Sequence, residues 1–292
     1  GYAGYLYSLN YARERPQGRL PDGKNPNAPQ VSIIEHADVK RMLLAQKAYV
    51  EGAFDLGLYA ARVFDDTETL ETEEQRKNAL ELLDLLTPIV KAWPSDYCLK
   101  ANELAIQILG GHGYTREYPV EQYYRDNRLN PIHEGTNGIQ SLDLLARKVT
   151  MNGGAALKQL SGLIQSCCKR AAEYSELNEL REPLEKLHAH IGSVTMALLG
   201  DMGQGKVNEA LANSALYLKA FGHMVIGWRW LEQAVKAQQG LAAGNAADTA
   251  FYQGKLQAAR YFLRWEVPSC HHDLNVLENR DLTCYDMQDA WF

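Results

Sequence analysis

Apolar residues recur at a helical spacing along most of this chain, and no useful stretch alternates apolar and polar residues as a half-buried β-strand would. The pattern is clear in the segment 38–64, where Val39, Met42, Leu43 and Val50 repeat near every 3.6 residues. The same periodicity predicts helices over 1–15, 38–64, 72–93, 95–109, 138–149, 157–174, 183–199, 206–239 and 246–266. The pattern therefore predicts an all-α protein.

Proline, glycine and acidic residues indicate where these helices end. An acidic connection is expected over 65–71, and Thr72 with Gln75 forms a capping-box pattern that opens the next helix. Pro94 should kink or interrupt the pattern that follows, and Pro268 should close the last long helix before a loop-rich tail. A loop is also expected around Pro16, Gly18, Pro21, Gly23, Pro26 and Pro29.

Two helical domains are expected from the length and from one break in the pattern. The chain has 292 residues, enough for one large or two moderate domains. Gly153 and Gly154 lie in the segment 151–155, which is the strongest candidate boundary. We therefore expect an antiparallel helical bundle over 1–150, followed by an additional C-terminal helical domain over 151–292.

Composition excludes several classes of protein. With 46% hydrophobic residues, 23% charged residues and a net charge of -6, the chain fits a soluble protein and lacks the basic footprint of a nucleic-acid-binding surface. No apolar run reaches the ~18 residues that a membrane span needs. The sequence predicts no signal peptide, because the opening apolar segment is short and has no charged leader.

The five cysteines form no CxxC pair, and an odd count in a large chain favours reduced thiols and a cytoplasmic setting. Two histidine-containing segments suggest a metal site, the run from Cys270 to Asp273 and the pair His188 and His190. Neither has the spacing of a closed zinc site. We therefore expect ordinary surface or packing roles for both, and no metal.

Candidate chemistry is concentrated between residues 107 and 140. Glu134 is a lone carboxylate in a short break between two helical patterns, and loops between rigid helices often carry catalytic residues. Three motifs occur there in order: the glycine turn QILGGHGY from Gln107 to Tyr114, the pair Arg125-Asp126, and the triplet Glu134-Gly135-Thr136.

These three motifs closely resemble the C-terminal signature of the acyl-CoA dehydrogenases, at the spacing of that family. The resemblance implies FAD as cofactor and hydride acceptor, an acyl-CoA thioester as substrate, and α,β-desaturation as the reaction. It also implies electron-transfer flavoprotein as electron acceptor and a homo-oligomer, dimer or tetramer. By the same resemblance, flavin contacts are expected at Gln107, Gly110, Gly111, Thr136 and Asn137.

A second stretch, YARERPQG from Tyr11 to Gly18, is similar to the family segment whose arginine approaches the flavin pyrophosphate of a neighbouring subunit. That similarity assigns Arg15 to the phosphate and Gln17 as its companion. Gly18 departs from the phenylalanine of most members. His36 is a further candidate flavin contact, although Ala37 replaces the glutamine that follows it in the family.

The resemblance implies that Glu134 is the catalytic base. Desaturation removes a proton from Cα and a hydride from Cβ, and an apolar, desolvated pocket raises a carboxylate's pKa enough for the first step. Gly135 would let the substrate approach the backbone. Some members place the base elsewhere and usually lose the loop glutamate, so the presence of Glu134 favours this assignment.

The match is better still with longer bacterial members that have an added C-terminal helical domain, including those that act on 3-(methylthio)propionyl-CoA. The N-terminal helical domain and the β-domain of the family have no counterpart here, so the chain resembles the C-terminal part of a longer protein and is expected to be inactive alone. Two other hypotheses about the function stay open. The chain could be a non-catalytic helical dimerisation module, or a DNA-associated relative of the family, which the negative net charge disfavours.

Overall fold

The computed structural model is helical throughout, as the sequence predicts, and describes residues 1–21, 25, 27–244 and 246–292. Within these residues the only extended pairing is an isolated antiparallel bridge between Pro16 and Ser32. The α-helices are α1 (Tyr2–Glu14), α2 (Ala37–Thr69), α3 (Glu73–Leu109), α4 (Gly111–Tyr114), α5 (Val120–Asn127), α6 (Asn137–Asp143), α7 (Met151–Ala171), α8 (Asn178–Gly203), α9 (Val207–Leu211), α10 (Ser214–Ala242), α11 (Thr249–Tyr261) and α12 (Val267–Glu278).

Short turns of other helical types join these elements. Five-residue π-helical segments, η2 (Leu144–Lys148) and η5 (Phe262–Glu266), follow α6 and α11. The 3-10 turns are η1 (Ile33–Glu35), η3 (Ser175–Leu177), η4 (Ala246–Asp248) and η6 (Asp289–Trp291).

Contacts divide the chain into two compact units. Unit 1 consists of Gly1–Phe54 and Pro94–His133, and unit 2 consists of Asp55–Trp93 and Glu134–Phe292. Two of the boundaries therefore fall inside α2 and α3, each of which contributes to both units, and the third falls between His133 and Glu134. These units are defined by contacts, and each consists of two separate segments of the chain. The two consecutive domains expected at 1–150 and 151–292 stay a prediction.

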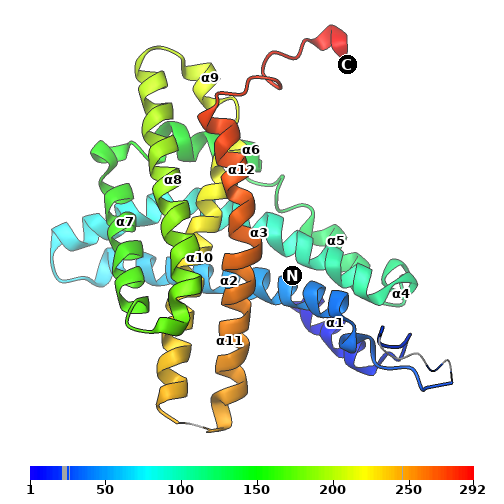
Figure 1. The fold of residues 1–292 in the computed structure, drawn as a ribbon. Coiled ribbons are helices and arrows are strands. Elements are labelled where there is room, and N and C mark those ends of the chain that lie inside the picture. The colour runs from blue at the N-terminus through cyan, green and yellow to red at the C-terminus, as the bar shows by residue number, and fades with distance from the viewer. Residues whose placement is uncertain (22–24, 26, 245) are drawn as a thin grey trace. The chain divides into compact units, whose positions relative to one another are not determined.

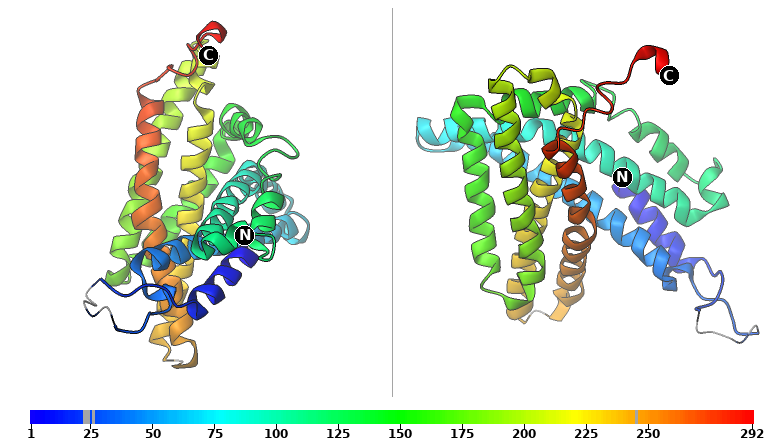
Figure 2. Two further views of the ribbon diagram at one scale, coloured as in Figure 1. Left: turned by 90° about the vertical axis from the view of Figure 1, so that its right-hand side faces the viewer. Right: turned by 45° about the horizontal axis from the view of Figure 1, so that its top comes forward.

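Unit 2 contains an antiparallel helical bundle. α7, α8, α10 and the continuous segment formed by α11, η5 and α12 lie side by side and alternate in direction (Figure 1). Figure 2 shows these helices from two further directions. Its core is built from large side chains that are fully buried: Tyr217, Phe221, Trp228, Trp230 and Phe262.

Unit 1 is held together by polar contacts as well as apolar packing. Buried Ser8 of α1 donates a hydrogen bond to Gln46 of α2 at 3.1 Å, and Asn102 of α3 donates to the carbonyl of Tyr123 in α5 at 3.1 Å. Gly4 lets α1 lie against α3, because a Cβ at this position would be 2.4 Å from the Asn102 side-chain oxygen. These contacts fix α1, whose C-terminal end leads directly into the first candidate site segment.

Local signals in the sequence give mixed outcomes. The capping box is confirmed, since the Gln75 N–H donates to Thr72 Oγ1 at 3.2 Å and the Thr72 N–H donates to Gln75 Oε1 at 3.1 Å. The break at 151–155 is also present, because Asn152, Gly153 and Gly154 all have positive φ angles. The expected loop around Pro16 includes Gly23 and Pro26, which lie outside the described residues.

Three expected helix ends are wrong. The acidic connection at 65–71 is largely helical, since α2 continues to Thr69. Pro94 does not interrupt the helix, because α3 is one helix from Glu73 to Leu109, and the alternative of a kink at Pro94 stays a prediction. Pro268 opens α12 instead of closing a helix, and the chain stays helical to Glu278. Proline tolerates the first turn of a helix, where its missing N–H has no intrahelical acceptor to lose.

Candidate functional site

The segment that carries Arg15 and Gln17 is paired with a second, extended segment of unit 1. The N–H of Gln17 donates to the carbonyl of Val31 at 2.9 Å, and the N–H of Ile33 donates to the carbonyl of Arg15 at 2.8 Å. The N–H of Val31 donates in turn to the carbonyl of Gly18 at 3.1 Å. The backbone at Arg15 and Gln17 is therefore held in place, while both side chains are exposed.

His36 fastens this paired segment. Its Nε2–H donates to the carbonyl of Gln17 at 2.7 Å, which makes Nδ1 the unprotonated ring nitrogen in the neutral side chain. Gly18 has a φ of +73°, and a Cβ there would lie 3.4 Å from the His36 ring. A phenylalanine at position 18 would therefore conflict with the backbone angle, while its Cβ would be in ordinary contact with the ring. The structure gives His36 a positioning role for Gln17, and its expected contact with the flavin stays a prediction.

A pocket of about 520 Å³ adjoins Arg15 in unit 1. Its aromatic wall was not anticipated from the sequence: the Tyr11 hydroxyl is 2.9 Å from His112 Nδ1, and the His112 ring stacks on Tyr118 with centroids 4.7 Å apart. Tyr11 and His112 are 101 residues apart, so no local signal could pair them. Within the described residues, the Arg15 and Gln17 side chains make no hydrogen bond or ion pair, and Arg15 lines this pocket together with Glu14.

The glycine turn after α3 contains glycines with different physical roles. Gly110 has φ +60° and ψ −136°, a combination open to little besides glycine, and a Cβ on Gly110 or Gly111 would meet no atom within 4 Å. Gly113 is instead required by packing, since its Cβ would lie 2.5 Å from the carbonyl oxygen of Ile106. The exposed side chain of Gln107 has no partner in the described part of the chain.

Glu134 lies in unit 2 on a sharply turned backbone. Its φ is +50°, and Gly135 follows with a φ of +86°. A Cβ on Gly135 would lie 3.1 Å from Gln140 Nε2, which itself donates to the Glu134 carbonyl at 3.5 Å. A non-glycine residue in the left-handed region is uncommon and costs energy. The turn leaves the Glu134 side chain exposed and without a partner in the described residues.

Thr136 and Asn137 connect this turn to the helices. Thr136 is the N-cap of α6, where its hydroxyl oxygen accepts a hydrogen bond from the Ile139 N–H at 3.4 Å. The Asn137 side chain is engaged by α3, because Oδ1 accepts from Lys91 Nζ at 3.0 Å and Nδ2 donates to the carbonyl of Ala92 at 3.5 Å. These contacts anchor the turn, and the expected flavin contacts at Thr136 and Asn137 stay predictions.

The candidate residues therefore form two groups, one in each unit. Unit 1 holds Arg15, Gln17, His36, Gln107, Gly110 and Gly111, and unit 2 holds Glu134, Gly135, Thr136 and Asn137. Arg15, Gln17 and His36 are brought together by the paired backbone, and Glu134 to Asn137 by one turn.

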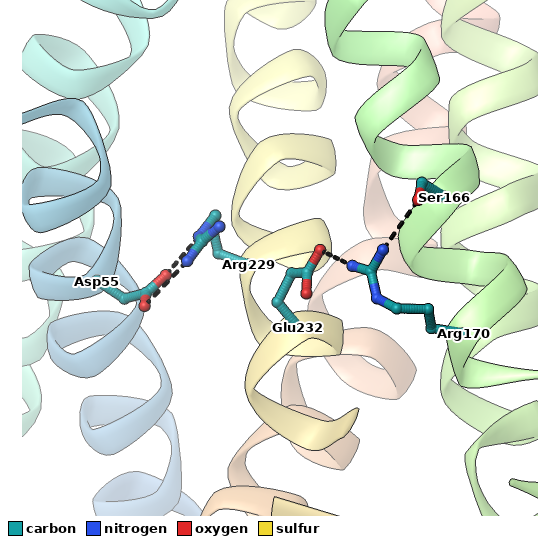
Figure 3. Close-up of polar contacts among 5 residues, drawn as sticks. All are labelled: Asp55, Ser166, Arg170, Arg229 and Glu232. Atoms are coloured by element: carbon teal, nitrogen blue, oxygen red, sulfur yellow. Dashed lines mark hydrogen bonds and ion pairs between the residues drawn. The ribbon is translucent and has the colours of Figure 1, made fainter. Parts of the chain in front are cut away.

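A charged cluster in unit 2 was also missed by sequence reasoning. Arg229 of α10 binds both carboxylate oxygens of Asp55, from Nε at 2.6 Å and from Nη2 at 3.3 Å (Figure 3). One turn further along α10, Glu232 pairs with Arg170 of α7, which also donates to Ser166 at 2.9 Å. Asp55 and Arg229 are 174 residues apart, and only the folded chain brings them together.

The histidine-containing segments meet each other. His190 Nδ1 and His271 Nδ1 are 2.9 Å apart, and the two rings stack with centroids 5.2 Å apart. Burial lowers the pKa of His271, and the nearby His190 and Lys186 lower it further. Among the described residues, no three His, Cys, Asp or Glu side chains gather as metal ligands, and no helix is long and apolar enough to cross a membrane.

Comparison with known proteins accounts for almost the whole chain. Residues 23–150 match the family model described as acyl-CoA dehydrogenase, C-terminal domain, and residues 160–288 match the model described as acetyl-CoA dehydrogenase C-terminal like.

The broad-specificity linear acyl-CoA dehydrogenase FadE5 of Mycobacterium tuberculosis is 34% identical over 99% of this chain and 49% of its own length. The 3-methylmercaptopropionyl-CoA dehydrogenase of Ruegeria pomeroyi is 34% identical over 91% of this chain and 44% of its own length. The chain thus spans about half the length of the curated relatives it matches.

The fold has clear counterparts among solved structures. An acyl-CoA dehydrogenase from Bacillus anthracis, complexed with FAD, matches 99% of this chain and 47% of its own at a TM-score of 0.69 and 16% identity. Caenorhabditis elegans ACDH-11, in complex with C11-CoA, matches 96% of this chain and 44% of its own at a TM-score of 0.68 and 16% identity. The chain therefore belongs, by its sequence matches, to the acyl-CoA dehydrogenase family and represents its C-terminal region, and its fold agrees with this.

Proposed function

We propose that this chain is the C-terminal part of an FAD-dependent dehydrogenase that desaturates an acyl-CoA thioester, with Glu134 as the catalytic base. One observation carries the proposal: the Glu134 carboxylate is exposed and unpaired on a turn whose backbone is fixed on both sides. A solvated structural glutamate needs no left-handed backbone, whereas a base must be aimed at one atom.

The residues of unit 1 fit a flavin. The guanidinium of Arg15 has no partner in the described residues, and it is planar, permanently charged and able to bind a phosphate through two donors. Gly110 and Gly111 leave space where side chains would stand, so another molecule can approach their backbone. Arg15 with Gln17 would hold the phosphate end, and Gln107 with the two glycines would contact the rest of the cofactor. His36 would keep Gln17 in place.

The bound flavin would supply the hydride acceptor for Cβ. Glu134 would take the proton from Cα of the thioester onto its carboxylate. The N–H of Glu134 has no acceptor in the described residues and is available to the thioester carbonyl, where it would stabilise developing negative charge. Gly135 would allow the thioester to approach the backbone. Closure of the site around Glu134 by substrate and other parts of the protein would remove water and make the carboxylate more basic.

The family also supports proposals about the wider protein. We infer that the natural polypeptide is longer, cytoplasmic and homo-oligomeric, and that it passes electrons to electron-transfer flavoprotein. Exposed apolar side chains such as Leu58 and Phe64 of α2 supply a surface for assembly. The same surface favours the second candidate function, a helical dimerisation module without catalysis.

One experiment separates these two functions. The longer polypeptide should purify yellow with one FAD per chain, and a saturated acyl-CoA should bleach the flavin under anaerobic conditions. A colourless dimer that does not react with any acyl-CoA would contradict catalysis and leave the assembly module. The 292-residue chain alone should be colourless, because it offers only part of the contacts that would hold the cofactor, and such partial contacts bind a flavin poorly.

A further inference from the structure

A large pocket in unit 2 has no part in the function proposed above. It has a volume of about 860 Å³ and lies among α2, α3, α7, α10 and α11. Its size falls within the range of small-molecule sites, which is about 300–1,000 Å³. It shares no residue with the turn at Glu134 or with the segment at Arg15.

The walls of the pocket are mainly apolar. Aliphatic side chains, Val63 of α2, Leu82 of α3 and Leu163 of α7 among them, line it together with aromatic residues of α10 and α11. The rings meet edge to face: Tyr59 and Trp228 at 87°, Phe251 and Tyr252 at 68°. Such pairs offer no parallel slot for a planar ligand, so a flexible alkyl chain fits these walls better than an aromatic ring does.

The charges in the lining favour an anionic head group. The negative charges of Asp55 and Glu232 are already neutralised by Arg229 and Arg170. Lys236 is exposed on the lining and has no hydrogen bond or ion pair in the described residues. Arg62 is held only by Asp66, at 3.9 Å and largely in water, where such a pair is weak.

Two buried hydrogen-bond donors in the same lining have no acceptor within the described residues. Trp228 Nε1 and Gln233 Nε2 are sealed from water and lack an acceptor within the described residues, although Trp228 is only 2% exposed. Buried donors in native proteins are usually satisfied by protein, water or ligand. A ligand with acceptor oxygens could satisfy either donor after a small movement of the side chain, whereas an ammonium head group could not.

We propose that this pocket is a second ligand site, which binds an amphiphilic carboxylate: an alkyl chain against the apolar walls and a carboxylate at Lys236 and Arg62. The apolar walls stabilise the chain by removing it from water, and the cations set the sign of the head group. Asp66 lies beside Arg62 and weakens the attraction for an anion.

Calorimetric titration of the 292-residue chain with decanoate, below its micelle concentration, tests the site. Lys236→Glu should weaken binding about tenfold, because it reverses a charge at the head group, and Asp66→Asn should strengthen it about two- to threefold. Lys186→Glu is the matched control, since Lys186 is exposed in the same unit and lies outside the pocket lining. It should leave the affinity for decanoate unchanged.

Two further measurements keep the test decisive. Leu163→Trp should fill the apolar end and abolish binding, with folding checked by thermal unfolding. Decylamine carries the same chain with the opposite charge and should bind at least about tenfold more weakly than decanoate. Equal binding of both compounds, an equal loss with Lys186→Glu and Lys236→Glu, or no binding of decanoate would overturn the proposal. So would binding that is lost in the longer polypeptide, because a segment of the protein itself would then cover the pocket.

Discussion

The turn at Glu134 and the bundle of α7 to α12 differ in how their charged residues are paired. Glu134 is exposed and unpaired, on a backbone held in the left-handed region. In the bundle, by contrast, Lys219 pairs with Asp273 at 2.7 Å and Arg260 pairs with Glu179 at 2.7 Å. Satisfied charges serve the fold, whereas a charge kept free on a fixed backbone is available to another molecule.

Arg15 belongs with Glu134 in this comparison. Its backbone is paired with the segment at Ile33, while its guanidinium has no partner in the described residues. Arg229 shows the alternative, because its guanidinium is bound by Asp55 and covered by the ring of Tyr59 at 4.4 Å. Changes at Glu134 and Arg15 should therefore alter the rate of reaction and the binding of the cofactor, whereas changes in the bundle should alter the stability of the fold.

The largest effect is expected at Glu134. In the longer polypeptide, Glu134→Gln keeps the size of the side chain but removes the carboxylate that accepts the proton, so turnover should fall about 10²–10⁴-fold. FAD content and acyl-CoA binding should be retained. The rate of anaerobic flavin reduction by excess substrate measures the effect.

Glu173→Gln is the control for this variant, since Glu173 is exposed and lies outside the turn. It should reduce its flavin at the wild-type rate. If Glu134→Gln also reduced its flavin at the wild-type rate, the base would lie elsewhere, and the free carboxylate at the turn would have no role in the reaction.

In the bundle, the largest effect is expected at Trp230. Its side chain is fully buried in α10, so Trp230→Ala removes a large apolar group and leaves a cavity. The free energy of unfolding should fall by about 3–5 kcal/mol. Urea unfolding of the 292-residue chain measures it. Met196→Ala, at a side chain that is 70% exposed, should change stability by less than about 0.5 kcal/mol.

The sequence predicts the helices well because their signals are local. Thr72 and Gln75 cap each other within one turn, and the apolar segment of α10 is buried on all sides, since every residue from Ala220 to Trp228 is buried. It mispredicts Pro268, because proline can start a helix as well as end one, and the residues near it do not decide which. Helix ends therefore depend on tertiary packing more than helix interiors do.

The candidate site could be predicted only as far as a motif reaches. Glu134 and Gly110 stand out in the sequence because their neighbours form a recognisable pattern. The contact of Tyr11 with His112 spans 101 residues and leaves no periodic signal. The motif also does not reveal why each glycine is needed: Gly110 is required by its φ angle and Gly113 by packing against α3.

A smaller effect on stability is expected at Arg229. Arg229→Ala leaves Asp55 without its bidentate partner in a half-buried environment, so the free energy of unfolding should fall by about 1–3 kcal/mol. Urea unfolding of the 292-residue chain measures the loss. The double variant with Asp55→Ala should lose less than the sum of the single variants, because the pair is then removed as a whole. Strict additivity would show that the pair in Figure 3 does not couple the two helices.

The effect on stability should be close to zero at Arg15. Arg15→Ala should change the free energy of unfolding by less than about 0.5 kcal/mol, since its side chain has no partner within the described residues. In the longer polypeptide the same variant should weaken FAD binding about tenfold, through the loss of a charge-assisted contact to phosphate. Arg116→Ala, at an exposed arginine of the same unit, is the control and should retain FAD fully. Loss of stability without loss of FAD would place Arg15 with the structural charges.

A modest effect is expected from acid at the pair of His190 and His271. Burial, then the nearby His190 and Lys186, lower the pKa of His271, so the unfolded chain binds this proton more readily than the folded chain does. The corresponding stability is complete above the unfolded value of about 6.5 and is lost as the pH falls below it. The melting temperature should therefore drop between about pH 7.5 and about pH 5.5, and His271→Gln should reduce that drop.

His272→Gln is the matched control, because His272 is the adjacent residue and is exposed. Equal drops in the two histidine variants would show that His271 contributes nothing to the acid sensitivity of the bundle.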